Sequence, residues 1–311
     1  MRDGVSLAYL HEGRGGRPLL LLHGYPETKR IWWRNVRPLA AAGFEVIAPD
    51  LRGHGESDLS PGDAYDLAIY SRDVHALVHD VLGHARCAVV GGDVGGAVAV
   101  DLLHRFPGFV EQLCFFDTVP PPAPDLYAAA GLDYGAMSAI APGPTGDYRD
   151  WQGARPDELA AMLATPAARR QWVAAMYTNR LWASPGSFSA EDVAFMTEPF
   201  ADLARLRAGW AVYQLAHGRP MSEPPLFCGP VETPTLILYG ADDHVVRPDF
   251  MHFCEHAFTN RVGPLVIPGA GHFLQWERAD VFNPLVAAVF AGRESTRAAL
   301  AEPSRVWLWR G

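Results

Sequence analysis

A glycine-flanked aspartate joins a predicted strand to a predicted helix. Residues 87–98 read Cys-Ala-Val-Val-Gly-Gly-Asp-Val-Gly-Gly-Ala-Val, and Gly91 and Gly95 stand two positions before and after Asp93. A turn this sharp needs small neighbours, because its central residue is strained and its side chain is pushed out at the end of the sheet. The helix N-terminus would also favour the carboxylate. Asp93 is therefore either a nucleophile or a helix cap.

Strand-like and helix-like segments alternate on both sides of this turn. Short apolar runs predict buried strands, and amphipathic stretches that end at glycine or proline predict helices. The predicted strands are 5–9, 18–22, 44–48, the run that begins at Cys87, 113–116, 235–239 and 265–267. The predicted helices include 31–42, 67–82 and 279–290, and in 67–82 the apolar stripe is Val74, Leu77, Val78, Val81 and Leu82. This alternation predicts an α/β fold with a mostly parallel, doubly wound sheet.

A proline cluster at residues 120–124 interrupts the alternation. Proline cannot continue a helix or a central strand, and the next hundred or so residues contain helical stretches without a convincing strand. We therefore expect a core of residues 1–119 and 226–293, an inserted helical lid at 120–225, and a C-terminal tail at 294–311 to which we assign no role.

Composition excludes several classes of partner. The chain has 311 residues and a formal net charge of −9, which disfavours nucleic acids and acidic membranes. No apolar run is long enough to span a bilayer and no leader precedes the first strand, so we expect a cytoplasmic protein. The sequence leaves open whether the chain forms a homo-oligomer.

Metal and cofactor signals are weak. The four cysteines have no Cys-x-x-Cys spacing, which suggests neither a disulfide framework nor a zinc site. Two histidine pairs have i, i+4 spacing, His75/His79 and His252/His256, but neither forms a His-Glu-x-x-His motif. We expect solvated or half-buried helix histidines, and no metal or cofactor.

Three residues stand at the carboxyl ends of predicted strands in the order nucleophile, acid, histidine. They are Asp93, Asp243 and His272. This is the chain order of a hydrolase triad built on an open α/β sheet. Each residue alone could be incidental, but three beside glycines at one sheet edge favour a catalytic site.

An aspartate nucleophile selects a particular chemistry. An ordinary aspartate is ionised at neutral pH, so it attacks without the help of a base. It can form an ester with a strained or activated sp3 carbon, and His272, oriented by Asp243, would then activate the water that cleaves this ester. The oxyanion of that step forms on Asp93 itself, and the expected donors are the backbone N–H groups of Tyr25 and Val94.

Three motifs carry a resemblance to a known family. They are His-Gly-Tyr-Pro-Glu at 23–27, Asp-Leu-Arg-Gly-His-Gly-Glu-Ser at 50–57 and Gly-Asp-Val-Gly-Gly at 92–96. The chain resembles the α/β-hydrolases of the epoxide hydrolase group over nearly all of residues 5–290. The first two motifs belong to the fold at large. The third selects the Asp-nucleophile branch, which holds epoxide hydrolases and haloalkane or haloacid dehalogenases.

The resemblance implies two lid tyrosines that hold the epoxide oxygen. The stretches 146–152 and 207–214 are similar to those that carry them, which points to Tyr148 and Tyr213. An amphipathic lid tyrosine that only packs is the alternative for each. We also expect Trp151 and Trp210 to line the substrate pocket, although most lid aromatics pack against the core.

The residues beside Asp93 weigh against dehalogenases. Haloalkane enzymes of this branch usually place tryptophan after the nucleophile, and fluoroacetate-type enzymes place arginines there and shortly beyond, whereas this chain has Val94 and Ala97. For the triad acid, the resemblance leaves Asp117 in reserve behind Asp243, because some relatives take the acid from that strand.

These observations predict a cofactor-independent epoxide hydrolase that converts an apolar, medium-sized epoxide, aromatic ones included, to a vicinal diol with water. A haloalkane or haloacid dehalogenase is the alternative enzyme, and a non-catalytic ligand-binding homologue is the alternative outside enzymes.

Overall fold

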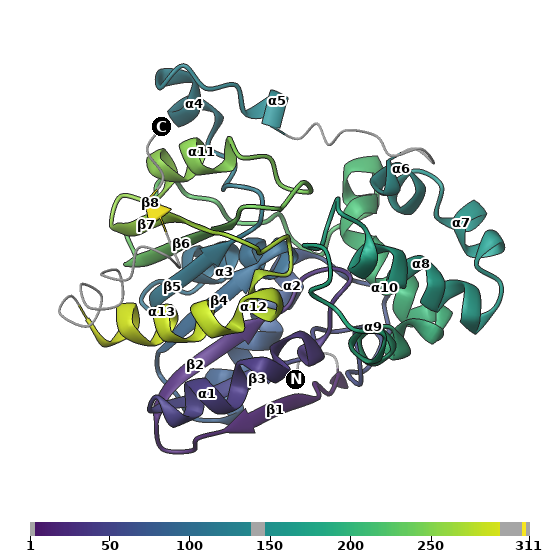
Figure 1. Cartoon of the computed structure of the whole chain (residues 1–311), viewed down its shortest axis with the longest axis horizontal. Coiled ribbons are helices and arrows are strands. Elements are labelled where there is room, and N and C mark those ends of the chain that lie inside the picture. The colour runs from purple at the N-terminus through teal and green to yellow at the C-terminus, as the bar shows by residue number, and fades with distance from the viewer. Residues whose placement is uncertain (1–3, 138–146, 293–306, 309–311) are drawn as a thin grey trace.

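A computed structural model describes residues 4–137, 147–292 and 307–308. In these ranges, eight strands form one sheet in the order β1-β3-β2-β4-β5-β6-β7-β8 (Figure 1). The strands are β1 Tyr9–Glu12, β2 Arg17–Leu22, β3 Phe44–Pro49, β4 Cys87–Gly92, β5 Val110–Phe116, β6 Thr235–Gly240, β7 Arg261–Ile267 and β8 Trp307–Leu308. Strands β2 to β7 are parallel, and only the described edge strands β1 and β8 run antiparallel to their neighbours. The predicted doubly wound, mostly parallel sheet is confirmed.

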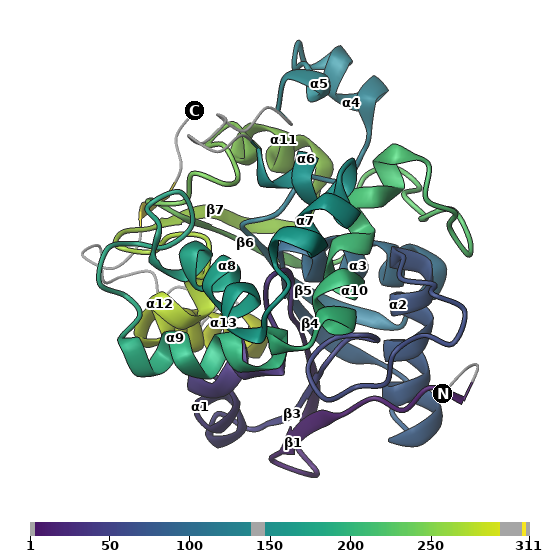
Figure 2. The same ribbon diagram turned by 90° about the vertical axis from the view of Figure 1, so that its right-hand side faces the viewer.

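Helices cover both faces of the sheet (Figures 1 and 2). Outside the segment between β5 and β6 they are η2 Lys29–Arg34, α1 Val36–Ala41, α2 Leu67–His75, η3 Ala76–Val81, α3 Asp93–Arg105, α11 Phe250–Ala257, α12 Leu274–Glu277 and α13 Ala279–Ala291. Strand β2 explains the arrangement, because side chains alternate along a strand. Leu19 and Leu21 are buried with α1 and α13 in one apolar cluster, whereas Leu20 and Leu22 are buried with α2, α3 and α11 in the other. A strand buried on both faces reads as a continuous apolar run.

The segment between β5 and β6 is helical in its described part. Its helices are α4 Pro124–Ala129, α5 Tyr134–Met137, α6 Tyr148–Gly153, α7 Pro156–Met162, α8 Pro166–Thr178, α9 Ala190–Thr197, η4 Glu198–Ala201, α10 Leu203–Gln214 and η5 Leu215–His217. Helices α6 to α10 gather beyond the carboxyl ends of the strands, on the right of Figure 1. Helix α4 instead packs on the core, where the Tyr127 ring lies 4.8 Å from the Phe253 ring of α11. We therefore propose that the lid proper consists of α6 to η5.

The predicted helix 31–42 is two shorter helices, η2 and α1. Pro38 has no N–H with which to bond the carbonyl of Arg34, four residues earlier. The side chain of Asn283 donates to that carbonyl instead, at 3.0 Å. Asn35 at the break is buried and donates to the backbone carbonyl of Gln275.

The predicted helix 67–82 changes its winding at Ala76, where the π-helical η3 replaces the α-helix α2. A wider turn rotates the residues that follow relative to an α-helix. Val74, Leu77 and Val78 are buried as the stripe predicts, but Val81 is 59% exposed. The assignment of Val81 to the buried stripe is wrong for this reason.

Both ends of the described chain differ from the expected pattern. The first strand begins at Tyr9 rather than at Val5, because the earlier residues bond to the loop after β3, as Ala8 N–H does to the Ser57 hydroxyl. In the tail, Trp307–Leu308 pairs with β7 as an edge strand. No helix in the described ranges is both long and apolar enough to cross a bilayer.

A buried ion pair holds the loop after β3 against α2. The Nε and Nη2 atoms of Arg52 each donate to Asp73 at 2.7 Å, and both side chains are 1% exposed. We expect Asp73→Asn to lower the free energy of unfolding by about 3–5 kcal/mol, because it removes the carboxylate charge that faces the buried guanidinium of Arg52. Chemical denaturation measures this change.

The matched control is Glu158→Gln, in the exposed pair between Arg155 and Glu158. It should leave the free energy of unfolding unchanged, because exposed ion pairs contribute little to stability. A loss below about 1 kcal/mol for Asp73→Asn would contradict the expectation, since that is the range of an exposed pair.

Candidate active site

Asp93 begins α3 directly after β4, with a backbone φ of 45°. A positive φ is unusual for a residue other than glycine. The strain that it causes persists only where the surrounding structure holds the residue in place. The flanking glycines permit the turn. A Cβ on Gly91 would lie 2.5 Å from the Gly95 carbonyl oxygen, and a Cβ on Gly95 would lie 2.3 Å from that of Leu22. The predicted sharp turn with small neighbours is therefore present.

The carboxylate of Asp93 makes a different contact with each oxygen. Oδ1 accepts the backbone N–H of Tyr25 at 2.7 Å, and Oδ2 lies 3.4 Å from Nε2 of His272. Val94 follows Asp93, and the two residues line one cavity. The backbone N–H of Val94 remains a predicted second donor to the oxyanion. The two oxygens thus face two different partners before any substrate is bound.

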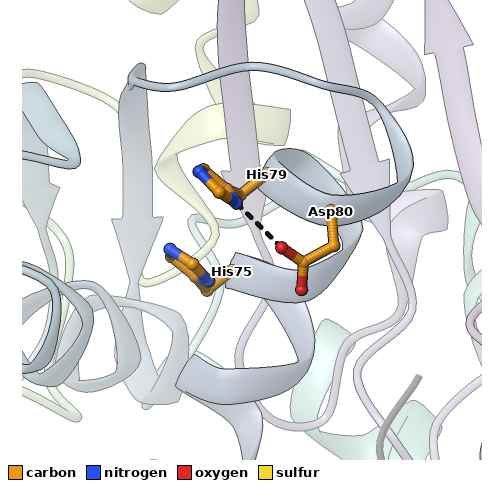
Figure 3. A group of neighbouring side chains, drawn as sticks. All are labelled: His75, His79 and Asp80. Atoms are coloured by element: carbon orange, nitrogen blue, oxygen red, sulfur yellow. Dashed lines mark hydrogen bonds and ion pairs between the residues drawn. The ribbon is translucent and has the colours of Figure 1, made fainter.

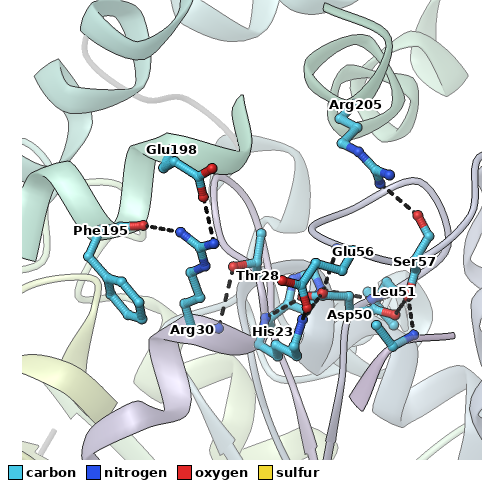
Figure 4. A network of polar contacts seen from close by, with 12 residues as sticks. His23, Thr28, Arg30, Asp50, Leu51, Glu56, Ser57, Phe195, Glu198 and Arg205 are labelled. Atoms are coloured by element: carbon cyan, nitrogen blue, oxygen red, sulfur yellow. Dashed lines mark hydrogen bonds and ion pairs between the residues drawn. The ribbon is translucent and has the colours of Figure 1, made fainter. Parts of the chain in front are cut away.

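The loop that carries Tyr25 is tied to the loop after β3 (Figure 4). Nε2 of His23 accepts the backbone N–H of Leu51 at 2.9 Å, and Oδ1 of Asp50 accepts that of Lys29 at 2.7 Å. Burial lowers the pKa of His23 well below the ordinary histidine value, which suits an uncharged acceptor. The first two sequence motifs therefore hold one another in place.

His272 lies between two carboxylates. Its Nδ1 is 3.0 Å from Oδ2 of Asp243, whose Oδ1 accepts the backbone N–H groups of Val245 and Val246. Burial alone would lower the pKa of His272, but the charge and hydrogen bond of Asp243, together with the charge of Asp93, outweigh it and raise this pKa well above the ordinary value. Asp243 therefore occupies the position of an acid that orients the imidazole.

Asp117 is buried beneath this pair and does not bond to His272. Its Oδ1 accepts the backbone N–H of Gly240 at 2.9 Å, and its Oδ2 has no hydrogen-bond partner among the described residues. Burial and the Asp243 charge raise the pKa of Asp117 well above its ordinary value. Of the two candidate acids, only Asp243 hydrogen-bonds to the histidine.

Tyr148 and Tyr213 come together from two lid helices. Their rings meet edge to face with centroids 5.8 Å apart, from α6 and α10 respectively, and both residues line one cavity with Asp93. Burial raises the pKa of each hydroxyl well above its ordinary value, and the Asp93 charge raises it further. Both phenols are therefore protonated donors at neutral pH.

A family model described as the alpha/beta hydrolase fold matches residues 17–279. The chain belongs to this family. It is similar to a soluble epoxide hydrolase from a Corynebacterium species, with 33% identity over 198 residues that span 62% of this chain and 63% of that enzyme. It is also 28% identical to a haloalkane dehalogenase of Bradyrhizobium diazoefficiens, over 96% of this chain and 95% of the dehalogenase. The solved epoxide hydrolase CorEH superposes with a TM-score of 0.74 at 23% identity, covering 93% of this chain and 96% of that one.

The cavity of this alpha/beta hydrolase has a volume of about 260 Å³ and mainly aliphatic walls. Besides Asp93 and the two tyrosines, its lining includes Leu67, Val94, Ala97, Val119, Val212, Leu215, Val245 and Val246, with Arg149 and Arg247. Trp151 and Trp210 are not part of it, which corrects the expectation for both. Trp151 packs beneath the Arg155 guanidinium, 3.9 Å from its ring centroid, and Trp210 is fully buried within the lid.

Two neighbours of the site had no role assigned from the sequence. Burial raises the pKa of Glu27 to about 7, while its Oε2 accepts the N–H of Gly24 at 2.6 Å within the Tyr25 loop. Trp182 packs edge to face on the His272 ring, and the backbone carbonyl of Trp182 accepts the backbone N–H of His272 at 2.6 Å. The position of Glu27 within the motif at 23–27 could have pointed to it. Nothing in the sequence points to Trp182, because its contact with His272 arises only in the tertiary structure.

One group of three side chains in the described ranges could hold a metal ion: His75, His79 and Asp80 (Figure 3). Their candidate ligand atoms lie within 4.8 Å of one another. The His75 ring stacks on Phe106 with centroids 3.7 Å apart, and Nδ1 of His79 lies 2.8 Å from Oδ1 of Asp80. These contacts account for the side-chain orientations, and the group lies away from the cavity beside Asp93.

The charge state of His272 depends on Asp93, because Asp93 and Asp243 together raise the pKa of this histidine. We expect Asp93→Asn to lower the pKa of His272, because one of the charges that stabilise the imidazolium is removed. At a fixed pH near this pKa, the neutral imidazole fraction therefore rises. NMR titration of the histidine ring protons measures the shift.

His252→Gln is a control for this titration, since His252 lies on the distant helix α11. It should leave the His272 titration unchanged while removing one signal from the spectrum. An unchanged or raised His272 pKa in Asp93→Asn would contradict the assigned electrostatics.

Proposed function

We propose that this chain is an epoxide hydrolase that uses Asp93 as its nucleophile. The observation that carries the proposal is that Asp93 and two protonated lid tyrosines line one mainly apolar cavity, while His272 lies beside Asp93. The similarity to epoxide hydrolases, one of which matches over 95% of this chain, supports it. The two tyrosines favour this activity over the dehalogenase alternative, because a developing alkoxide needs a proton whereas a halide ion does not.

The contacts of Asp93 assign a task to each oxygen. Oδ2 attacks a ring carbon, the C–O bond of the epoxide breaks, and Tyr148 or Tyr213 delivers a proton to the ring oxygen. Oδ1 keeps its hydrogen bond with the Tyr25 N–H and becomes the carbonyl oxygen of the ester. The first step thus yields an alkyl-enzyme ester, one new hydroxyl group and a tyrosinate.

The second step is hydrolysis of this ester, with His272 as the base. Water adds to the ester carbon of Asp93, its proton passes to Nε2 of His272, and the oxyanion forms on the oxygen held by Tyr25 N–H. The ester C–O bond breaks and the leaving alkoxide takes the proton from His272, which gives the second hydroxyl group. The remaining water proton leaves the Asp93 carboxyl group and restores the tyrosine.

Alkylation also prepares the base. Esterification removes the negative charge of Asp93, which is one of the two charges that raise the pKa of His272. The pKa of His272 therefore falls when the ester forms, and more of the imidazole is neutral when water must be deprotonated. The aliphatic cavity of about 260 Å³ favours a compact, apolar epoxide, and its walls provide no tryptophan to select an aromatic one.

Trapping the ester tests the nucleophile and the substrate class together. His272→Gln should accumulate a covalent adduct whose mass gain equals one whole epoxide, because alkylation proceeds but its hydrolysis lacks a base. Intact mass spectrometry after incubation with styrene oxide or 1,2-epoxybutane measures the gain. Adding Asp93→Asn to this variant should abolish the adduct.

Two other outcomes would overturn the proposal. A gain equal to an alkyl group from a haloalkane, without any epoxide adduct, would indicate a dehalogenase. No adduct from either class, with saturable ligand binding that does not depend on His272, would indicate the ligand-binding alternative.

The lid tyrosines are tested by their effect on ring opening. We expect Tyr148→Phe and Tyr213→Phe each to slow alkylation by about 100-fold, within the usual contribution of general acid catalysis, and the double variant to abolish it. Rapid-quench mass spectrometry of single turnovers measures the alkylation rate. Arg155→Gln in the lid is a control that should alkylate at the wild-type rate, and a wild-type rate in the double tyrosine variant would refute the assignment.

A further inference from the structure

Tyr25 contributes more to this structure than its backbone N–H. Its side chain is 1% exposed and extends from the loop after β2 into the lid. The hydroxyl oxygen accepts hydrogen bonds from Nε2 of Gln152 at 2.7 Å and from Nε1 of Trp210 at 3.2 Å. One residue of the loop beside the nucleophile is therefore bonded to two different lid helices.

The two donors lie on the helices that carry the site tyrosines. Gln152 stands four residues after Tyr148 on α6, and Trp210 stands three residues before Tyr213 on α10. Residues three or four apart lie on the same face of a helix, one turn from each other. The Tyr25 hydroxyl therefore holds each helix one turn away from a tyrosine that faces the cavity.

The packing around the Tyr25 ring fits this arrangement. A Cβ on Gly209 of α10 would lie 3.0 Å from Cδ2 and Cε2 of Tyr25, so the absence of a side chain there lets the helix approach the ring. The rings of Tyr25 and Tyr213 meet edge to face with centroids 5.5 Å apart. The contact between loop and lid is thus close as well as hydrogen-bonded.

We propose that the Tyr25 hydroxyl is a positioning group, which sets the place of Tyr148 and Tyr213 relative to the Asp93 carboxylate through Gln152 and Trp210. The proposal rests on the proposed function, because ring opening needs the nucleophile and the tyrosines at one substrate. The Tyr25 N–H holds Oδ1 of Asp93 while the Tyr25 hydroxyl holds α6 and α10, so a single residue spans the two halves of the site.

Other lid contacts lie farther from the tyrosines. Arg30 donates to the Phe195 carbonyl and pairs with Glu198, and Arg205 donates to the Ser57 carbonyl (Figure 4). These contacts attach α9, η4 and the start of α10 to the core. They restrain the lid as a whole, whereas Tyr25 acts within one helical turn of both tyrosines.

Tyr25→Phe tests the proposal, because it keeps the ring and the backbone N–H but removes the hydroxyl. We expect alkylation by 1,2-epoxybutane to slow by about 10- to 100-fold, since small displacements of reacting groups are costly. Decay of the trapped ester should stay within about twofold, because hydrolysis uses the unchanged Tyr25 N–H and His272. Single-turnover mass spectrometry separates the two rates.

Tyr177→Phe is the matched control. Tyr177 is also buried and its hydroxyl donates to the carbonyl of Pro26, the next residue of the same loop, at 2.5 Å, but it lies on α8, which carries neither site tyrosine. It should alkylate at the wild-type rate. Gln152→Leu should slow alkylation as Tyr25→Phe does, and the double variant should be no slower than the slower single variant, as expected for two ends of one interaction.

Three results would overturn the proposal. They are a wild-type alkylation rate in Tyr25→Phe, an equal slowing of alkylation and hydrolysis, and an equal effect of Tyr177→Phe. Each would make the hydroxyl a general structural contact rather than a positioning group.

Amide hydrogen exchange separates this test from that of the proposed function. Tyr25→Phe should speed exchange in α6 and α10 and leave the core helix α13 unchanged, whether or not the wild-type protein turns over an epoxide. If wild-type protein forms no epoxide adduct, the proposed function fails on that result. Unchanged exchange in α6 and α10 would refute the positioning group by itself.

Discussion

One negative charge, on the partly buried carboxylate of Asp93, organises this site. A carboxylate away from bulk water must be hydrogen-bonded or paired, or its charged form becomes too costly. Asp93 meets this requirement through the Tyr25 N–H on one oxygen and His272 on the other. Both partners come from loops at the carboxyl edge of the sheet, where a parallel sheet brings together chain segments that are distant in sequence.

The same carboxylate links the two chemical steps that we propose. While it is charged it raises the pKa of His272, and with Asp243 it favours the imidazolium. Once it is esterified, that support is lost and the imidazole is released to act as a base. No further residue is needed to lower the pKa of His272 for the second step, because esterification of Asp93 removes a negative charge beside the imidazole.

The lid completes the site through buried polar contacts as well as apolar packing. Tyr25 reaches into it, and the amide of Gln152 and the indole N–H of Trp210 would have no comparable partner without its hydroxyl. Leaving such donors unsatisfied costs more than an ordinary hydrogen bond contributes. This asymmetry favours the observed packing of the lid on the core, in which Tyr148 and Tyr213 line the same cavity as Asp93.

Local patterns in the sequence determined the alternating strands and helices, the sharp turn at Asp93 and the placement of polar residues at strand ends, because glycine spacing and apolar periodicity act over a few neighbouring residues. They did not determine the winding of η3, the hydrogen bond between Asp243 and His272, or the burial of Trp210 away from the cavity. Those features depend on which side chains meet across elements far apart in the chain. Only the tertiary structure decided them, since burial and hydrogen-bond partners depend on how distant elements pack together.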